Sequence, residues 1–378
     1  RDDGILRIGV LTPQNSANAD IGQAIQSGVE LAIGRINAAG GYNGQPVQLI
    51  PVDEDAAGIG PDPAITTLLD DGVDAIVGPA SSTNALSGLG EIVDAGVVAC
   101  SPTASASLLD EFPDGSLFFR TIPSDSLQAV AIADEVDQSG ASRTTLAYID
   151  DEYGQAFADS VESSLTSKGI QAVKLVPFSA NNASIEAAAK SVAATAVNVV
   201  VVLGDATAGR VMLEAIDGKE PGAKPHYIIN DAMRRPAASA EPFGASLAPR
   251  VIGVSPLAYS ADPQFLAEVG ATPDDPGPYA ANAYDCVNLI ALGAMASAST
   301  QPAAIASQIP AVSASGSPCM DFAQCVTDMK AGSNINYDGP GGRLTVGSNG
   351  DLSEAVFEVF GFDGSGRDVK VNTVAASG

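Results

Sequence analysis

Two runs of hydroxyl side chains, each directly after a predicted strand, are the part of this sequence best suited to binding chemistry. Ser81 and Ser82 follow an apolar strand at residues 75–77, and a Ser-Pro-Thr-Ala-Ser run at 101–105 follows a second strand at 97–100. Because the carboxyl ends of parallel strands meet at one edge of a sheet, we expect the two runs to lie side by side. Hydroxyl groups and the backbone N–H groups of a helix start suit a carboxylate or another anion. Helix capping alone would also place serines here, and the residues leave both interpretations open.

A strand–helix–strand unit is predicted to position these hydroxyl groups. The first strand ends at a Gly-Pro pair, and the serines after it can cap a helix. The apolar face of this helix is formed by Leu86, Leu89, Ile92 and Val93. Gly96 ends the helix, and the second strand follows at once. The unit therefore places a helix N-terminus and a hydroxyl-rich loop at the carboxyl ends of neighbouring strands.

Strands and helices alternate on both sides of this unit. Before it, strands are predicted at residues 6–11 and 47–52, and helices at 21–38 and 63–69. After a connecting strand at 118–123, the alternation restarts with strands at 145–149, 172–176, 197–203 and 226–229 and helices at 153–165, 185–194 and 211–216. This order predicts an α/β protein of two lobes, each a doubly wound parallel sheet.

The end of the chain is less regular and is expected to cross between the lobes. A strand at 251–257, a helix at 281–295 and a late strand at 356–362 are separated by turn-rich segments. Crossings near residues 121, 255 and 336 would form a three-stranded hinge. We therefore expect one lobe from residues 1–121 plus 256–335, and the other from 122–255 plus 336–378.

The composition excludes some classes of function. The chain has 378 residues, 46% of them hydrophobic, and a formal net charge of −27. This charge opposes binding to nucleic acids and anionic lipid surfaces, which need clustered Lys and Arg. Its apolar runs are shorter than the roughly 18–20 residues that a membrane-spanning helix needs. We interpret the charge as a surface property that serves adaptation to salt or solubility. The sequence starts at Arg1 without Met, which we interpret as the start of a processed chain.

Four cysteines and one histidine limit the metal and redox chemistry to be expected. Cys319 and Cys325 lie close together in a loop-like stretch, where they could close a small disulfide ring in an oxidising compartment. Cys100 lies in an apolar strand and Cys286 in a helix, so both are interpreted as buried small hydrophobes, with their pairing left open. The histidine, His226, lies in a strand, and the spacing of a zinc site is missing. Neither a metal nor a cofactor is expected.

Asp53, Glu54 and Asp55 form an acidic cluster after the predicted strand at 47–52. Three adjacent acids suggest a metal site. A solvated acidic turn is the more common arrangement, and we favour it.

Six stretches of the chain resemble a known family. They are INAAGGYNGQPVQLIPVDED, DAIVGPASSTNAL, DAGVVACSPTAS, FFRTIPSDSLQA, AYIDDEYGQAF and ANAYDCV. No single stretch is specific for the family. The six together are specific, because they occur in the order of the family and span nearly the whole length of the chain. On these motifs the chain resembles the type I periplasmic solute-binding proteins of the branched-chain amino-acid (leucine/isoleucine/valine-binding) group, which serve ABC importers. The resemblance is weakest at residues 236–249 and 299–330.

This resemblance implies a Venus-flytrap protein, whose two lobes close on a small solute held between them. It implies a periplasmic or cell-surface location, with or without a lipid anchor. It also implies a monomer that delivers an amino acid or a similar solute to a membrane permease. Because such a compartment is oxidising, the resemblance favours the disulfide between Cys319 and Cys325.

The family's ligand-binding positions fall on two loops of the first lobe. By resemblance, Ser81 or Ser82, together with Ser105, would hold the α-carboxylate of the ligand. The backbone carbonyl of Ala104 would accept a hydrogen bond from its ammonium group. The residue types fit, because both charges of an amino acid must be paired before they leave water.

Three residues of the second lobe are implicated by the resemblance, each with an alternative. Tyr153 would close over the ligand, or it would belong to the core. Asp231 would pair with the ammonium group, although an Asx turn after Asn230 would also explain it. Where the family carries aromatic residues after the strand at 197–203, this chain has Gly-Asp-Ala-Thr. Asp205 in this run could contact a cationic or polar side chain, but capping of the next helix is favoured.

The first loop, near residues 19–21, also lacks the tyrosine of the family. The lost aromatic walls weaken the case for an aliphatic ligand, while the groups that bind a zwitterion are retained.

An enzyme is the competing class, since two-lobed α/β proteins are often catalytic. The Gly-x-Ser-x-Gly elbow, the Walker phosphate loop and a Gly-x-Gly-x-x-Gly run after the first strand are missing, and one histidine makes a Ser-His-Asp triad implausible. A hydrolase that pairs Asp205 with Asp231 stays open. We predict a binding protein rather than an enzyme. The alternatives on the same fold are a ligand-sensing receptor ectodomain and a binder of amides, urea or carboxylates.

Overall fold

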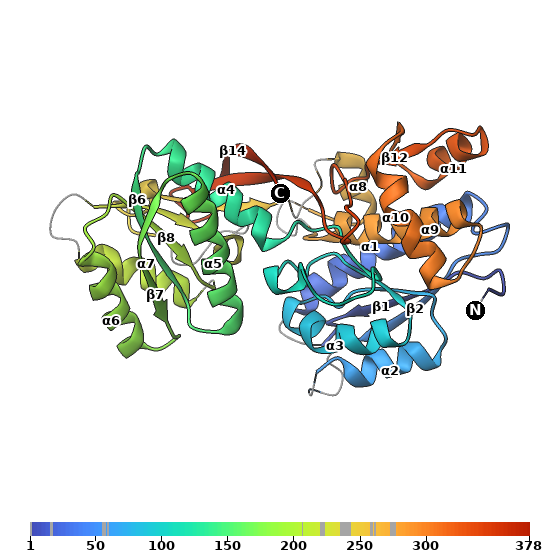
Figure 1. Ribbon diagram of the computed structural model, residues 1–378, viewed down its shortest axis with the longest axis horizontal. Helices are drawn as coiled ribbons and strands as arrows, with labels where there is room; N and C mark the ends of the chain where they lie inside the picture. The colour runs from blue at the N-terminus through green and yellow to red at the C-terminus, as the bar shows by residue number, and fades with distance from the viewer. Residues whose placement is uncertain are drawn as a thin grey trace. The chain divides into compact units, whose positions relative to one another are not determined.

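The computed structural model describes residues 2–15, 18–54, 58, 60–205, 207–219, 224–234, 243–257, 260, 262–272 and 277–378. The chain forms two compact units (Figure 1). The first unit comprises the chain up to Ser105 together with Leu109–Ser124 and Leu257–Ser353. The second unit comprises Ala106–Leu108, Asp125–Pro256 and Glu354–Gly378.

A five-stranded sheet of order β2-β1-β3-β4-β5, with every neighbouring pair parallel, forms the first unit. Its strands are β1 (Arg7–Thr12), β2 (Gln48–Asp53), β3 (Ala75–Val77), β4 (Val98–Ser101) and β5 (Phe118–Arg120). The helices α1 (Ala19–Ala38), α2 (Asp62–Asp70) and α3 (Ser82–Asp94) connect the first four strands. The predicted parallel sheet is confirmed in this unit, and the segment interpreted as a connecting strand is its fifth strand.

The two faces of this sheet are covered by different helices. Ile8 and Val10 of β1 pack into one core with α1 and with the buried helix α9 (Ala280–Ser297). Gly9 points to the opposite face, where a Cβ atom would lie 2.9 Å from a methyl carbon of Leu68 on α2. Successive side chains of a strand point to opposite faces of the sheet, so helices pack on both faces, which is the doubly wound arrangement.

The remaining elements of the first unit contribute to the same core as α9. They are α8 (Pro263–Glu268), α10 (Pro302–Ala314), β11 (Ser317–Cys319), α11 (Phe322–Lys330) and β12 (Ile335–Tyr337). In the described part of the chain, no single helix is both long and apolar enough to cross a membrane. The helices α9 and α10 meet that criterion only as a pair, which is bent by 106°.

Both cysteine pairs form disulfides. The predicted bond between Cys319 and Cys325 is present, but its setting is not a loop, because Cys319 ends β11 and Cys325 lies within α11. Cys100 and Cys286, interpreted as separate small hydrophobes, are bonded to each other. They are buried as expected, and their bond joins β4 to α9 across a sequence separation of 186 residues. No local pattern could reveal a pair that only the tertiary fold brings together.

The second unit has a seven-stranded sheet of order β14-β13-β10-β9-β8-β6-β7. Its strands are β6 (Arg143–Ile149), β7 (Gln171–Phe178), β8 (Val199–Leu203), β9 (His226–Ile229), β10 (Val251–Pro256), β13 (Glu354–Phe362) and β14 (Asp368–Ser377). The helices α4 (Asp125–Gln138) and α5 (Glu152–Ser167) pack in one core, and α6 (Asn182–Ala193) and α7 (Ala208–Lys219) in the other. Alternate valines of β8 enter each core.

The prediction of a purely parallel second lobe is wrong at one edge of this sheet. The strands β6 to β10 are parallel, whereas β13 is antiparallel to β10 and β14 is antiparallel to β13. Only the short turn at residues 363–367 joins β13 to β14, and a connection of this length permits only an antiparallel pair.

The third passage between the units also lies elsewhere than predicted. Residues 336–353 belong to the first unit, and the chain leaves it after Ser353 rather than near residue 336. Three contacts hold this segment there. The strand β12 pairs with β11, the Tyr337 hydroxyl donates to Asp285 Oδ1 at 2.8 Å, and Asp351 accepts from Arg120 Nε at 2.7 Å.

Candidate functional site

The first unit has a pocket of about 390 Å³ at the carboxyl edge of its sheet. The loops after β1, β2, β3 and β4 each contribute to its wall, through Pro13, Glu54, Ser81 and Thr103. The two hydroxyl-rich loops predicted to lie side by side therefore meet in one pocket. The Thr103 Oγ1 atom is buried and has no hydrogen-bond partner among the described residues.

Ser81 caps α3, as one interpretation of the hydroxyl run required. Its Oγ atom accepts from the Asn84 backbone N–H at 3.1 Å, and its backbone is extended. A hydroxyl that accepts in this way can still donate its own hydrogen to a ligand. Ser82 is the first residue of α3 and is half-buried, so both serines lie at the positive end of a thirteen-residue helix.

Replacing Ser81 by Ala should have two separable effects. Loss of the cap should lower the free energy of unfolding by about 1 kcal/mol. Loss of a hydroxyl donor at the pocket should weaken binding of any carboxylate ligand about tenfold, the value of one ordinary hydrogen bond. Chemical denaturation and titration calorimetry measure the two effects. Ser87→Ala on the exposed part of the same helix is the control, and equal affinities of the two variants would contradict a role for Ser81 in binding.

The loop after β4 is held by its first residue. Ser101 is buried; its hydroxyl donates to the Pro79 carbonyl at 2.7 Å and accepts from the Ala104 N–H at 3.0 Å. Ala104 is buried, and its carbonyl oxygen accepts from Arg120 Nη1 at 3.4 Å. Ser105 is half-buried and follows this turn. The loop thus joins the end of β3 to a buried guanidinium group.

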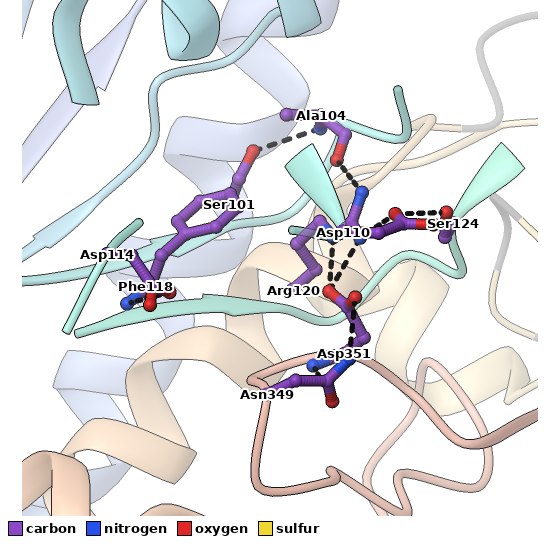
Figure 2. A network of polar contacts seen from close by, with 9 residues as sticks. All are labelled: Ser101, Ala104, Asp110, Asp114, Phe118, Arg120, Ser124, Asn349 and Asp351. Carbon is purple, nitrogen blue, oxygen red and sulfur yellow. Dashed lines mark hydrogen bonds and ion pairs between the residues drawn. The ribbon is translucent and has the colours of Figure 1, made fainter. Parts of the chain in front are cut away.

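Arg120, quoted above only within a family motif, is the centre of a polar network in this unit (Figure 2). Its side chain is 0% exposed and lies between two carboxylates, with Nη2 at 2.6 Å from both Asp110 Oδ1 and Asp351 Oδ1. Burial raises the pKa of Asp351, and the charge of Arg120 opposes that rise. An arginine inside the apolar strand β5 was the available signal, since a buried guanidinium needs partners.

The acidic turn after β2 is not fully solvated, which corrects the favoured interpretation. Glu54 is 3% exposed, lines the pocket and accepts from the Ala80 N–H at 2.8 Å through Oε2. It therefore fixes the loop that precedes Ser81. Asp53 accepts from Gln14 N and Asn15 Nδ2, and Asp55 lies outside the described residues. The described residues hold no group of three or more His, Cys, Asp or Glu arranged to bind a metal.

Tyr279 is a pocket residue that the sequence analysis missed. It is half-buried, lines the pocket of the first unit and directly precedes α9. Its backbone has φ +64°, a left-handed conformation that is costly for an aromatic residue and is often found at functional sites. The pocket therefore has an aromatic wall, although the tyrosine of the first loop is absent.

The second unit has a smaller pocket, of about 140 Å³, also at the carboxyl edge of its sheet. It is lined by residues after β6, β8 and β9, among them Tyr153, Asp205 and Asn230. Tyr153 is half-buried near the start of α5, and its ring centroid lies 6.3 Å from that of Phe157. This tyrosine thus packs against the core and also borders the pocket.

Asp205 caps α7, as favoured. Its Oδ1 atom accepts from the N–H groups of Thr207 at 2.7 Å and Ala208 at 2.6 Å, and its side chain is exposed. Close packing explains why an aromatic residue cannot stand at the preceding position. A Cβ atom on Gly204 would lie 2.7 Å from the Cα atom of Gly209.

Asp231 begins a short 3₁₀ helix, Asp231–Met233, and is half-buried. Its Oδ1 atom accepts from Gln128 Nε2 at 2.8 Å, and the same amide donates to the Val254 carbonyl at 2.8 Å. Burial raises the pKa of Asp231, against the hydrogen bond from Gln128 and the charge of Arg234. Its neighbours Asn230 and Ala232 line the pocket.

A search against known families matches residues 5–351 to the family described as periplasmic binding protein. Since this match covers most of the chain, the protein belongs to the periplasmic binding protein family, whose members typically act outside the cytoplasm. The match ends just before the antiparallel hairpin of β13 and β14.

Named relatives and solved structures agree with this assignment. The chain is 28% identical, over 89% of its length and 80% of the relative's, to the substrate-binding protein of a chemotactic signal transduction system from Halobacterium salinarum. It is 23% identical to the leucine-, isoleucine-, valine-, threonine- and alanine-binding protein of Pseudomonas aeruginosa, over 94% of its length and 89% of the relative's. An ABC transporter substrate-binding protein from Desulfitobacterium hafniense in complex with Leu shares the fold with a TM-score of 0.72, at 22% identity, and the match covers 97% of this chain and 100% of that one. The resemblance to the branched-chain amino-acid group is confirmed.

Proposed function

We propose that this protein is the extracytoplasmic solute-binding component of an ABC importer and binds an amino acid or an amino-acid-like solute. The pocket of the first unit carries the proposal, because Ser81 at the N-terminus of α3 and Thr103 after β4 converge there. Hydrogen-bond donors and the positive end of a helix suit the α-carboxylate of such a ligand. Two of the proteins compared above bind amino acids by name or as solved, which supports the same class of ligand.

In this proposal, Ser81 or Ser82, together with Ser105, holds the α-carboxylate. Ala104 offers its carbonyl to the ammonium group. That oxygen already accepts from Arg120, but a carbonyl has two acceptor sites and can serve both donors. No Lys, Arg or His is among the described residues that line either pocket, so a second ligand carboxylate would lack a partner. A neutral or cationic side chain is therefore favoured over an acidic one.

The second unit contributes Tyr153 and Asp231 in this proposal, and Asp205 contacts a polar side chain of the ligand. A ligand held by the first unit alone would bind the open and closed states with equal affinity and would not shift the equilibrium between them. Tyr153 and Asp231 would therefore provide the difference in affinity that closes the two units on the ligand.

The protein acts as a monomer and returns its ligand unchanged, so incubation with the ligand should yield no product.

The Asp231→Ala variant tests this arrangement. Loss of a charge-assisted bond to the ammonium group should weaken amino-acid binding about 30- to 150-fold, from roughly 2–3 kcal/mol. It should also abolish the ligand-induced decrease in radius of gyration, measured by small-angle scattering at saturating ligand. Asp137→Ala is the control, because it removes an exposed acid of the same unit that lies on α4 and does not line the pocket. Normal compaction of Asp231→Ala would exclude Asp231 from closure.

A sensing role is the second candidate. The relative from Halobacterium salinarum is named for a chemotactic signal transduction system, which favours this alternative for a protein of the same family. Deletion of the gene would separate the two. Loss of solute uptake indicates the importer component, and loss of the response to the solute with uptake intact indicates the sensor.

A further inference from the structure

We propose that Arg120 is a positioning residue. It holds three segments of the first unit in one arrangement: the ligand-binding loop after β4, the segment that ends at Ser124 and the segment that ends at Ser353. The identity of that loop as ligand-binding rests on the proposed function. The positioning itself rests on contacts within the first unit.

The three nitrogen atoms of the Arg120 guanidinium group together reach three different segments, and Nη2 contacts both carboxylates (Figure 2). Nη1 donates to the Ala104 carbonyl at 3.4 Å, in the loop after β4. Nη2 pairs with Asp110 at 2.6 Å, and Nε donates to Asp351 at 2.7 Å. A planar donor fork can join three segments in this way, whereas an ammonium group has no such fixed geometry.

Two of these contacts lie beside the points where the chain leaves the unit. Ser124 is the last residue of the Leu109–Ser124 segment of the first unit, and its hydroxyl donates to Asp110 Oδ1 at 2.6 Å. Asp351 lies two residues before Ser353, the last residue of the later segment. The backbone N–H of Arg120 also donates to the Gly350 carbonyl at 3.0 Å. A Cβ atom on Gly350 would lie 1.9 Å from the Phe118 carbonyl oxygen, so this close approach requires glycine.

The ligand loop is tied to β5 as well as to the guanidinium group. The Thr121 N–H donates to the Ser101 carbonyl at 3.3 Å, and Ser101 accepts from Ala104 as described. The loop and both exits thus share one buried cation. Because that cation is 0% exposed and is shared by all three segments, we expect a change at one of its contacts to alter the others.

Arg120→Lys is the first test, since it keeps the charge and removes the fork. Hydrogen exchange of the ligand-free protein should rise at least about tenfold at the amides of residues 101–106 and 121–125, the increase expected when one or two hydrogen bonds of a locally opening segment are lost. The affinity for the amino acid that binds the wild type should fall by a similar factor. Arg250→Lys is the control, because Arg250 is an arginine of the second unit whose guanidinium group bonds the Asp217 carboxylate and two backbone carbonyls.

Ser124→Ala and Asp351→Asn each weaken one part of the network without removing the cation, and they carry the test if Arg120→Lys fails to fold. Ser124→Ala should raise exchange at 121–125 and leave 103–105 close to wild type. Asp351→Asn should raise exchange at 349–353 and, through the guanidinium group, at 103–105. If the Arg120 and Arg250 variants lose stability alike and neither changes exchange at 101–106, Arg120 is structural and the proposal fails. Because exchange is measured without ligand, this failure is distinct from a failure to bind amino acids.

Discussion

Removal of the bond between Cys100 and Cys286 should destabilise this protein more than removal of the bond between Cys319 and Cys325. The first closes a loop of sequence separation 186 and the second one of separation 6. In the chain-entropy account, a bond restrains the unfolded chain more when its loop is longer. That account gives losses of about 5 and about 2 kcal/mol for the two bonds.

The experiment compares Cys100→Ala/Cys286→Ala with Cys319→Ala/Cys325→Ala. All four sulfur atoms belong to buried residues, so the two double variants lose similar packing and the difference reports the loops. The midpoint temperature of thermal unfolding should fall on the order of 10–20 °C in the first variant, which is about twice the decrease expected in the second variant. Equal losses in the two variants would contradict the loop-length argument for this fold.

The second large effect is a loss of stability with rising pH, caused by Asp285. This carboxyl group is buried in the first unit, where it accepts from the Tyr337 hydroxyl at 2.8 Å and the Gly341 N–H at 2.9 Å. Burial raises the pKa of Asp285 to about 8, although both hydrogen bonds oppose the rise. The folded state thus holds a proton that the unfolded chain releases near pH 4. The stabilising contribution of the protonated form is complete below pH 4 and is lost as the pH rises to about 8.

Asp285→Asn should remove this dependence. Asp74 has the same sign, but burial raises its pKa only to about 6, so its contribution ends at lower pH. Between pH 6.5 and 9 the wild type should lose about 2 kcal/mol on account of Asp285, and Asp285→Asn should lose far less. Denaturant unfolding at several pH values measures this. Asp137→Asn, an exposed carboxylate of α4, should follow the wild type. A wild type whose stability is flat over this range would show that Asp285 is ionised at lower pH than its burial implies.

The parts of the fold that could be predicted are those with a local cause. The strand at 75–77 is uniformly apolar and ends at Gly-Pro, and the helix after it has a serine cap and an apolar face, so β3, α3 and β4 lie within a residue or two of their predicted bounds. Within that face Leu89 and Ile92 are buried, whereas Leu86 and Val93 are partly exposed. By contrast, α10 lies in a stretch rich in Ala, Ser and Gln, where hydrophobic periodicity is weak.

What could not be predicted depends on contacts between distant segments. Asp351 is polar and follows a turn, so nothing in its neighbourhood reveals that it pairs with Arg120, 231 positions away. The same holds for Cys100 with Cys286 and for Tyr279, whose place in the pocket is set by the start of α9. The hydroxyl loops were found because two neighbouring parallel strands must end at the same edge. The partners behind them were not, because burial of a charge is a property of the whole unit.

The measurement that tests the central claim most directly is thermal unfolding of the purified protein with a panel of amino acids and of carboxylates that lack an ammonium group. A ligand that binds only the folded state stabilises it by about 2.7 kcal/mol at one hundred times its dissociation constant, so a hit is visible at modest affinity. We predict stabilisation by at least one neutral or cationic amino acid, with no effect of the matching carboxylate alone. Stabilisation only by compounds without an ammonium group would contradict the proposed zwitterion site and the role of Asp231 within it.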